Sequence, residues 1–203
     1  MNGAMSAAGI VRVDAASVAP QAWRNGGGQT RELLAWPAGS DWRLRISRAD
    51  IASDGPFSAF PGIERWFAVL QGAGVILTFA DAVHQLQAGD APLRFDGAAA
   101  PVCRLLDGAT QDLNLMLRHG TGVMRAVQDA QPWQETFAMR GLYTTVAGHW
   151  NDGQQSCPVP ADTLLWIAAS TMNAWTFAPD LGCGARGQKS ATGAWWLGFT
   201  PED

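Results

Sequence analysis

Charge and basic clusters are scarce in this sequence of 203 residues. Charged side chains make up 16% of the chain, the net charge is −4, and Lys and Arg form no cluster. A protein that follows a phosphate backbone needs such a cluster, so we expect no nucleic-acid partner. No window holds 18 uninterrupted apolar residues, and Met1 to Gly9 lacks the basic start of a signal peptide. We therefore expect a cytoplasmic protein without a membrane partner.

Sequence motifs typical of metal-binding sites and of catalytic nucleophiles are also scarce. The three histidines, His84, His119 and His149, are not spaced as His-x-His or four residues apart. We expect each of them to be structural or exposed, since a metal site needs several ligands that converge. Three widely spaced cysteines favour reduced thiols. No Gly-x-Ser-x-Gly elbow is present. The sequence therefore predicts no metal, no cofactor and no identifiable catalytic residue, and we lean against an enzyme.

Short alternating segments separated by glycine-rich turns dominate the remaining sequence. Hydrophobic residues make up 47%, and the 23 glycines and 11 prolines follow no period. Even spacing of short strands without amphipathic helices is typical of antiparallel sandwiches and barrels. We predict an all-β fold with strands at 10–13, 29–36, 42–51, 65–70, 75–79, 83–86, 91–95, 102–106, 111–118, 142–147, 163–168, 174–177 and 194–199.

A glycine triplet at 26–28 follows Trp23-Arg24-Asn25. It lacks the Gly-Lys-Ser/Thr ending of a phosphate loop, and no helical pattern follows it. We interpret it as a wide turn or bulge before the strand at 29–36.

A second glycine-rich turn, Gln71 to Gly74, separates the strands at 65–70 and 75–79. Turn residues between two apolar runs favour a β-hairpin, and we expect this hairpin to form one wall of any site. Glu64 and Arg65 stand at its start and point to opposite faces if the strand is regular. Both side chains cannot line the same binding cavity, and we expect Arg65 to be the one that does.

Several strands carry an apolar face and a polar face. Leu113, Leu115 and Leu117 alternate with Asp112 and Asn114, and the leucine face is expected to be buried. In a small barrel, such a polar face can line a cavity for one ligand. An internal network of ion pairs and a solvated sheet face are the alternatives. The candidate ligand-binding residues are Thr30, Glu32, Arg45, Ser47, Arg65, Asp112, Asn114 and Arg118.

Arginines in a partly desolvated cavity favour a carboxylate ligand, because a guanidinium can donate two parallel hydrogen bonds to it. We expect Arg45 and Arg65 to bind the carboxylate and Glu32 and Asp112 to hold the arginines. Neutral hydrogen bonds would come from the remaining polar side chains, Thr30, Ser47 and Asn114.

A polar segment at 127–134 divides the chain into two related β units, which we place at 1–125 and 126–203. Ten tryptophans fill a core, or in the second unit serve as a dimer face that includes Trp195 and Trp196. A homodimer is therefore a possible assembly.

The segment from Glu64 to Gly74, followed by Leu86-Gln87-Ala88-Gly89-Asp90, resembles the cupin pattern without its histidines. The resemblance becomes specific with Trp23-Arg24-Asn25-Gly26-Gly27-Gly28-Gln29-Thr30-Arg31-Glu32, which is similar to the opening motif of the HutD/Ves family. Further motifs of that family follow in order: Arg45-Ile46-Ser47-Arg48-Ala49, Gly55-Pro56-Phe57-Ser58, Phe60-Pro61-Gly62-Ile63-Glu64-Arg65, Phe95-Asp96-Gly97 and Asp112 to Arg118.

This resemblance implies a bicupin, two β-barrel or jelly-roll units in one chain, in a bacterial cytosolic setting. For HutD it also implies a link to histidine utilisation, through binding of an acidic intermediate such as urocanate or formylglutamate. The alternative is a cupin enzyme, an isomerase or a metal-dependent oxygenase of unknown substrate.

Overall fold

A computed structural model describes residues 9–128, 131–168, 172–180 and 193–202 of the chain. Strands make up the regular structure of these residues, apart from two short 3₁₀ turns, η1 (Ala15–Ser17) and η2 (Gly97–Ala99). The predicted all-β, antiparallel fold is confirmed. Cys183 lies outside the described residues.

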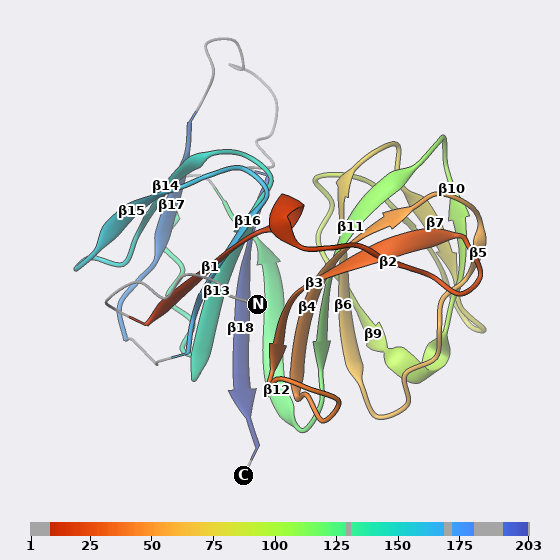
Figure 1. Cartoon of the computed structure of the whole chain (residues 1–203), viewed down its shortest axis with the longest axis horizontal. Coiled ribbons are helices and arrows are strands. Elements are labelled where there is room, and N and C mark those ends of the chain that lie inside the picture. The colour runs from red at the N-terminus through yellow and green to blue at the C-terminus, as the bar shows by residue number, and fades with distance from the viewer. Residues whose placement is uncertain (1–8, 129–130, 169–171, 181–192, 203) are drawn as a thin grey trace. The chain divides into compact units, whose positions relative to one another are not determined.

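The chain forms two compact units, and the first contains residues 18–121 with 201–203. Its strands form a six-stranded sheet in the order β2-β3-β4-β11-β6-β9 and a four-stranded sheet in the order β5-β10-β7-β8 (Figure 1). Their bounds are β2 (Gln21–Ala22), β3 (Gly28–Trp36), β4 (Leu44–Ile51), β5 (Gly55–Pro56), β6 (Glu64–Gln71), β7 (Val75–Thr78), β8 (Val83–Leu86), β9 (Leu93–Asp96), β10 (Val102–Leu105) and β11 (Thr110–Leu117).

The second unit contains residues 1–17 and 122–200. A five-stranded sheet, β1-β16-β13-β18-β12, and a three-stranded sheet, β15-β14-β17, form it. The predicted domain boundary near residue 125 stays a prediction, and the contacts group the first strand with the later part of the chain. The strands are β1 (Ile10–Asp14), β12 (Gly120–Ala126), β13 (Met139–Thr144), β14 (Gly148–Asn151), β15 (Ser156–Val159), β16 (Thr163–Ile167), β17 (Thr176–Pro179) and β18 (Ala194–Pro201).

The predicted hairpin between 65–70 and 75–79 is wrong. Both strands exist, but β6 pairs with β11 and β9, whereas β7 pairs with β10 and β8 in the other sheet. The turn between them is a corner where the chain changes sheets. Gly72 and Gly74 have φ of 95° and 106°, and a Cβ at Gly74 would lie 2.2 Å from the Leu86 carbonyl oxygen. This close backbone approach requires glycine. Glycine-rich turns are also typical of hairpins, so the turn residues alone did not distinguish a change of sheet from a hairpin.

The glycine triplet forms a wide turn, as predicted. The Trp23 amide donates to the Gly28 carbonyl at 2.9 Å, and a Cβ on Gly28 would lie 2.4 Å from the Asp50 carbonyl oxygen. The bulge lies further along, inside β3, where the register with β4 shifts between Glu32 and Leu34. Short strands without clear alternation were missed, namely β2, β5, β12, β14 and β15.

Tryptophan fills the core of the second unit. Trp150 and Trp175 are fully buried and meet edge to face at 5.0 Å, and Trp133 stacks on Trp196 at 5.4 Å. Trp195 is also buried, with 4% of its surface exposed. Trp195 and Trp196 therefore form no exposed face in the single chain. A homodimer stays a prediction.

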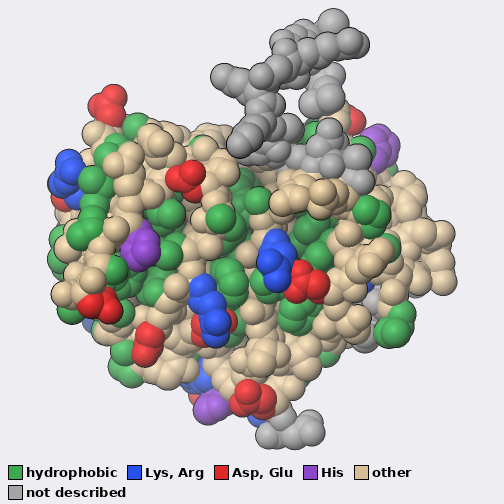
Figure 2. All heavy atoms as spheres, turned by 180° about the vertical axis from the view of Figure 1, so that it is seen from behind, with side chains coloured by type: hydrophobic (Ala, Val, Ile, Leu, Met, Phe, Trp, Pro, Cys, Tyr) green, Lys and Arg blue, Asp and Glu red, His purple; other side chains and the backbone are tan. Residues whose placement is uncertain are grey.

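Charges of both signs are scattered among apolar and neutral side chains on the face that Figure 2 displays. No helix of the described residues is long and apolar enough to cross a membrane.

A candidate anion-binding pocket

The six-stranded sheet presents one polar face built by strict alternation. Ser47 of β4 pairs with Asn114 of β11, and Asn114 pairs in turn with Phe67 of β6. One step along, Met116 lies between Arg45 and Arg65. Paired residues of neighbouring strands point to the same side of a sheet, so these side chains share a face. The opposite faces of β4 and β11 carry fully buried leucines and Ile46, as the alternation predicted.

A pocket of about 620 Å³ lies over this polar face. Its volume is in the range of pockets that hold small molecules. Six of the eight predicted site residues contribute to its lining: Thr30, Arg45, Ser47, Arg65, Asp112 and Asn114. Binding of a ligand by these residues stays a prediction.

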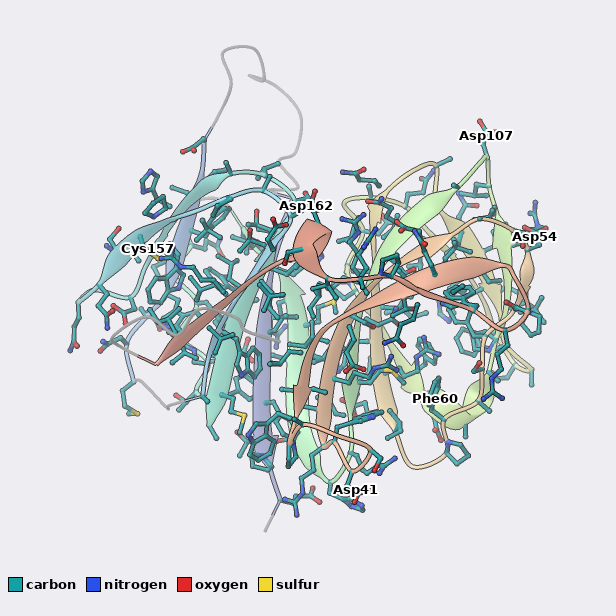
Figure 3. The ribbon with its side chains drawn as sticks, viewed as in Figure 1. Asp41, Asp54, Phe60, Asp107, Cys157 and Asp162 are labelled. Atoms are coloured by element: carbon teal, nitrogen blue, oxygen red, sulfur yellow. The ribbon has the colours of Figure 1, made fainter. Side chains whose placement is uncertain are left out.

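Arg65 is the most unusual of these side chains, because only 6% of it is exposed. Its guanidinium carbon lies 5.1 Å from the ring centre of Phe57, 5.7 Å from Phe60 and 5.0 Å from Phe95. Figure 3 labels Phe60 on the segment that leads into β6. Burial is the main reason that the pKa of Arg65 falls to about 10, so the side chain stays charged at neutral pH. Three rings cover the guanidinium, and its remaining edges are left for polar partners.

One hydrogen bond of Arg65 is fixed by the protein. Nη2 donates to Oδ1 of Asn114 at 2.8 Å, and Nδ2 of Asn114 donates to Oδ1 of Asp112. Nε of Arg65 is buried and has no hydrogen-bond partner among the described residues. The cation is therefore incompletely satisfied, which is costly for a buried charge and marks a site for an additional acceptor.

Asp112 has 1% of its surface exposed. Burial raises its pKa to about 8, Arg65 opposes that shift, and Asp50 adds to it. The neutral acid is thus the favoured form at neutral pH. Asn114 links Asp112 to Arg65, and the role of Asp112 in holding the arginines stays a prediction.

Arg45 is held by Glu32, as predicted. Nε of Arg45 donates to Oε2 of Glu32 at 2.8 Å, and Glu32 is not part of the pocket lining. Arg118 is also absent from the lining, and its guanidinium lies 5.2 Å from the ring centre of Trp42. Arg118 follows the last residue of β11, Leu117, so the alternation no longer determines its direction.

Two segments outside the predicted strands, residues 21–25 and 56–60, complete the pocket. Trp23 lies on one wall, where its Nε1 donates to Oγ1 of Thr30 at 2.8 Å. Residues 23–25, 56–58 and 60 belong to the family motifs, which were the only signal for them, and Gln21 and Ala22 precede the first motif. The added lining residues are Gln21, Ala22, Trp23, Arg24, Asn25, Ala49, Pro56, Phe57, Ser58, Phe60 and Met116.

The described residues contain no group of three or more His, Cys, Asp or Glu side chains placed to hold a metal ion. His84 instead packs edge-on against Phe79, with ring centres 5.7 Å apart.

Comparison with known proteins defines the relatives of this fold. The sequence profile of the HutD family matches residues 15–178. Protein Ves of Citrobacter koseri is 35% identical over 136 residues, which are 66% of this chain and 71% of Ves. The solved structure of HutD from Pseudomonas fluorescens SBW25 has a TM-score of 0.78 at 23% identity, with 96% of this chain and 100% of that chain covered. Protein Ylba from E. coli has a TM-score of 0.67 at 10% identity, with 97% and 93% covered.

Two units, each of two antiparallel sheets, define this protein as a bicupin, and one unit carries a polar pocket around a buried arginine. The match over most of its length and the identity with Ves show that the chain belongs to the HutD family. Both the suspected family and the fold class are confirmed.

Proposed function

We propose that the pocket binds a small carboxylate without a metal ion. The observation that carries this proposal is the state of Arg65, a buried and charged side chain whose faces are covered by three phenylalanine rings and whose Nε lacks a partner. A carboxylate supplies two acceptor oxygens in the plane of the guanidinium and neutralises its charge.

The charges around the pocket support an anion in preference to a cation. Arg24, Arg45 and Arg65 contribute to the lining, and the one acid among the lining residues, Asp112, is mostly neutral at pH 7. Arg45 already has Glu32 as its partner, so Arg65 is the primary carboxylate contact and Arg45 a secondary one. Neutral hydrogen bonds come from Ser47 and Thr30.

Membership of the HutD family suggests the chemical class of the ligand. We propose that the protein acts in the bacterial cytoplasm and modulates histidine utilisation by binding an acidic intermediate of the urocanate or formylglutamate class. HutD from Pseudomonas fluorescens was solved in a formate condition, and formate is the smallest carboxylate. That setting supports formate as a minimal probe.

A thermal-shift screen against histidine, urocanate, formylglutamate, glutamate and formate tests this proposal. We expect at least one carboxylate to raise the melting temperature, since a ligand that binds only the folded state stabilises it. Arg65→Ala should abolish that shift, whereas Arg104→Ala, which removes an exposed arginine outside the pocket, should retain it.

The variants separate loss of binding from loss of folding. Arg65→Ala must still melt cooperatively, and Arg65→Lys, which keeps the charge without the planar fork, should show a reduced shift. A full shift in a folded Arg65→Ala protein, or no shift of the wild-type protein with any of the five compounds, would contradict the proposed function.

A further inference from the structure

Asp112 is less exposed than Ser47, Arg65 and Asn114, the other buried polar residues of the pocket. It is 1% exposed, and it contributes to the lining beside Arg65 and Asn114. Asn114 connects the two, since it accepts a hydrogen bond from Arg65 with its oxygen and donates one to Asp112 with its nitrogen. Asp112 and a carboxylate bound to Arg65 would therefore share a single buried cation.

The other groups around Asp112 do not supply a second cation to balance it. On β4, Asp50 is acidic, and Arg45 is already paired with Glu32 of β3. On β10, the buried Cys103 is a neutral thiol, because burial raises its pKa to about 12. The exposed Arg24 lies in the loop wall of the pocket, and the segment 56–60 contributes no charge. An ionised Asp112 beside a bound anion would leave two negative charges near Arg65.

Two carboxylates that share a buried site rarely both ionise, because each raises the pKa of the other. The pKa of Asp112 is already about 8 without any added anion, mainly because of burial. An anion at Arg65 adds a negative charge nearby and raises this pKa further. A neutral acid can also donate an O–H hydrogen bond to a carboxylate, which an ionised one cannot do.

We propose that Asp112 binds the ligand as a neutral carboxylic acid and donates its hydrogen bond to the ligand's carboxylate, so that the ligand and one proton occupy the pocket together. The inference rests on the proposed function. Where Asp112 is ionised in the free protein, the proton comes from solvent and remains on Asp112 while the ligand is bound. No covalent bond is formed or broken.

The sign of the pH dependence follows directly. Below about pH 8, Asp112 already carries its proton, so the dissociation constant should not change with pH. Above that pH, binding must take up a proton, and the dissociation constant should rise by up to about tenfold per pH unit. Asp112→Asn provides a donor that does not titrate, and this variant should lack the dependence.

Isothermal titration calorimetry with formylglutamate tests this linkage. Titrations at pH 7 and pH 9, each in two buffers of different ionisation enthalpy, report the number of protons taken up. We expect uptake near zero at pH 7 and between one half and one proton at pH 9 in the wild-type protein, and a much smaller uptake at pH 9 in Asp112→Asn, from Arg65 alone. Titration of Arg65 would persist in Asp112→Asn, so this variant identifies the responsible group.

The outcomes separate this inference from the function on which it rests. Binding without proton uptake at pH 9, or equal uptake in Asp112→Asn, would overturn the role of Asp112 and leave carboxylate binding intact. Absence of binding by the wild-type protein at both pH values and in the five-compound screen would overturn both. The buffer comparison on the wild-type protein remains decisive if Asp112→Asn does not fold.

Discussion

Each unit of this protein contains a buried arginine packed against aromatic rings, yet the two are satisfied in different ways. Arg140 of the second unit is 1% exposed, and its guanidinium carbon lies 4.4 Å from the ring centres of both Trp133 and Trp175. Its Nη1 and Nη2 donate to the backbone carbonyls of Asn173 and Trp133 at 2.7 and 3.0 Å. Arg65 has similar ring contacts but donates one hydrogen bond, to a side chain, and borders a pocket of about 620 Å³.

The comparison teaches that a buried arginine in an aromatic cage is not by itself a binding site. Burial lowers the pKa of both side chains to about 10. Arg65 and Arg140 differ in the acceptors of their hydrogen bonds. Backbone carbonyls accept two hydrogen bonds from Arg140, which fits a structural cation, whereas Arg65 donates to a single side chain and borders a cavity, which fits a site for an anion.

The largest effect is expected at Arg140. Arg140→Met should lower the free energy of unfolding by about 3 kcal/mol or more, because the carbonyl oxygens of Trp133 and Asn173 lose their donor and the packing between two rings is disturbed. Urea titration followed by tryptophan fluorescence measures this. Arg125→Met is the control, since Arg125 is 57% exposed in its ion pair with Glu135 and should cost less than about 1 kcal/mol.

If Arg140→Met and Arg125→Met lowered the free energy of unfolding equally, the structural role assigned to Arg140 would be contradicted. A loss of the ligand-induced thermal shift in Arg140→Met alone would place a function in the second unit and would contradict the assignment of binding to Arg65.

A smaller, pH-dependent effect is expected at Asp112. Its pKa rises from an ordinary value of 3.8 to about 8 in the fold, so between these values the folded state binds a proton that the unfolded state has lost. Stability contributed by this proton is present at low pH and is lost as pH rises toward 8, with a slope of at most about 1.4 kcal/mol per pH unit.

Urea unfolding of the wild-type protein and Asp112→Asn at pH 5, 6.5 and 8 measures this effect. The wild-type protein should be more stable relative to the variant at pH 5 than at pH 8. A stability difference that stays constant with pH would mean that Asp112 is not protonated in the fold.

The smallest effect is expected at Arg118, which alternation along β11 grouped with the pocket residues. Its guanidinium packs on Trp42, and Arg118→Ala should cost less than about 1 kcal/mol of stability. The thermal shift produced by the carboxylate should be unchanged in this variant. Loss of the thermal shift in Arg118→Ala would show that Arg118 takes part in binding, and the pocket would then have to extend to this residue.

Local pattern predicted the faces of the strands well, and for a clear reason. Side chains alternate strictly along β4 and β11, so the partition of Ser47 from Ile46, or of Asn114 from Leu115, follows from the sequence alone. The partner of each strand does not follow, because pairing is decided by contacts far apart in the sequence. Two strands joined by a glycine-rich turn therefore resembled a hairpin although they belong to different sheets.

The loop residues that line the pocket could not be predicted from the sequence, for a related reason. No periodicity fixes the direction of Trp23 or Phe57, whose positions depend on backbone turns and on packing against the sheet. The family motifs contain both residues but do not state what they do. The pairing of Arg45 with Glu32 was predictable, because period two places them on one face of neighbouring strands.

A crystal structure of the complex with formylglutamate, at concentrations near the measured dissociation constant, tests the central claim most directly. We predict one ligand carboxylate within about 3 Å of a guanidinium nitrogen of Arg65 and of a carboxyl oxygen of Asp112. A ligand bound elsewhere, with Arg65 contacting only Asn114 and its three rings, would contradict the account.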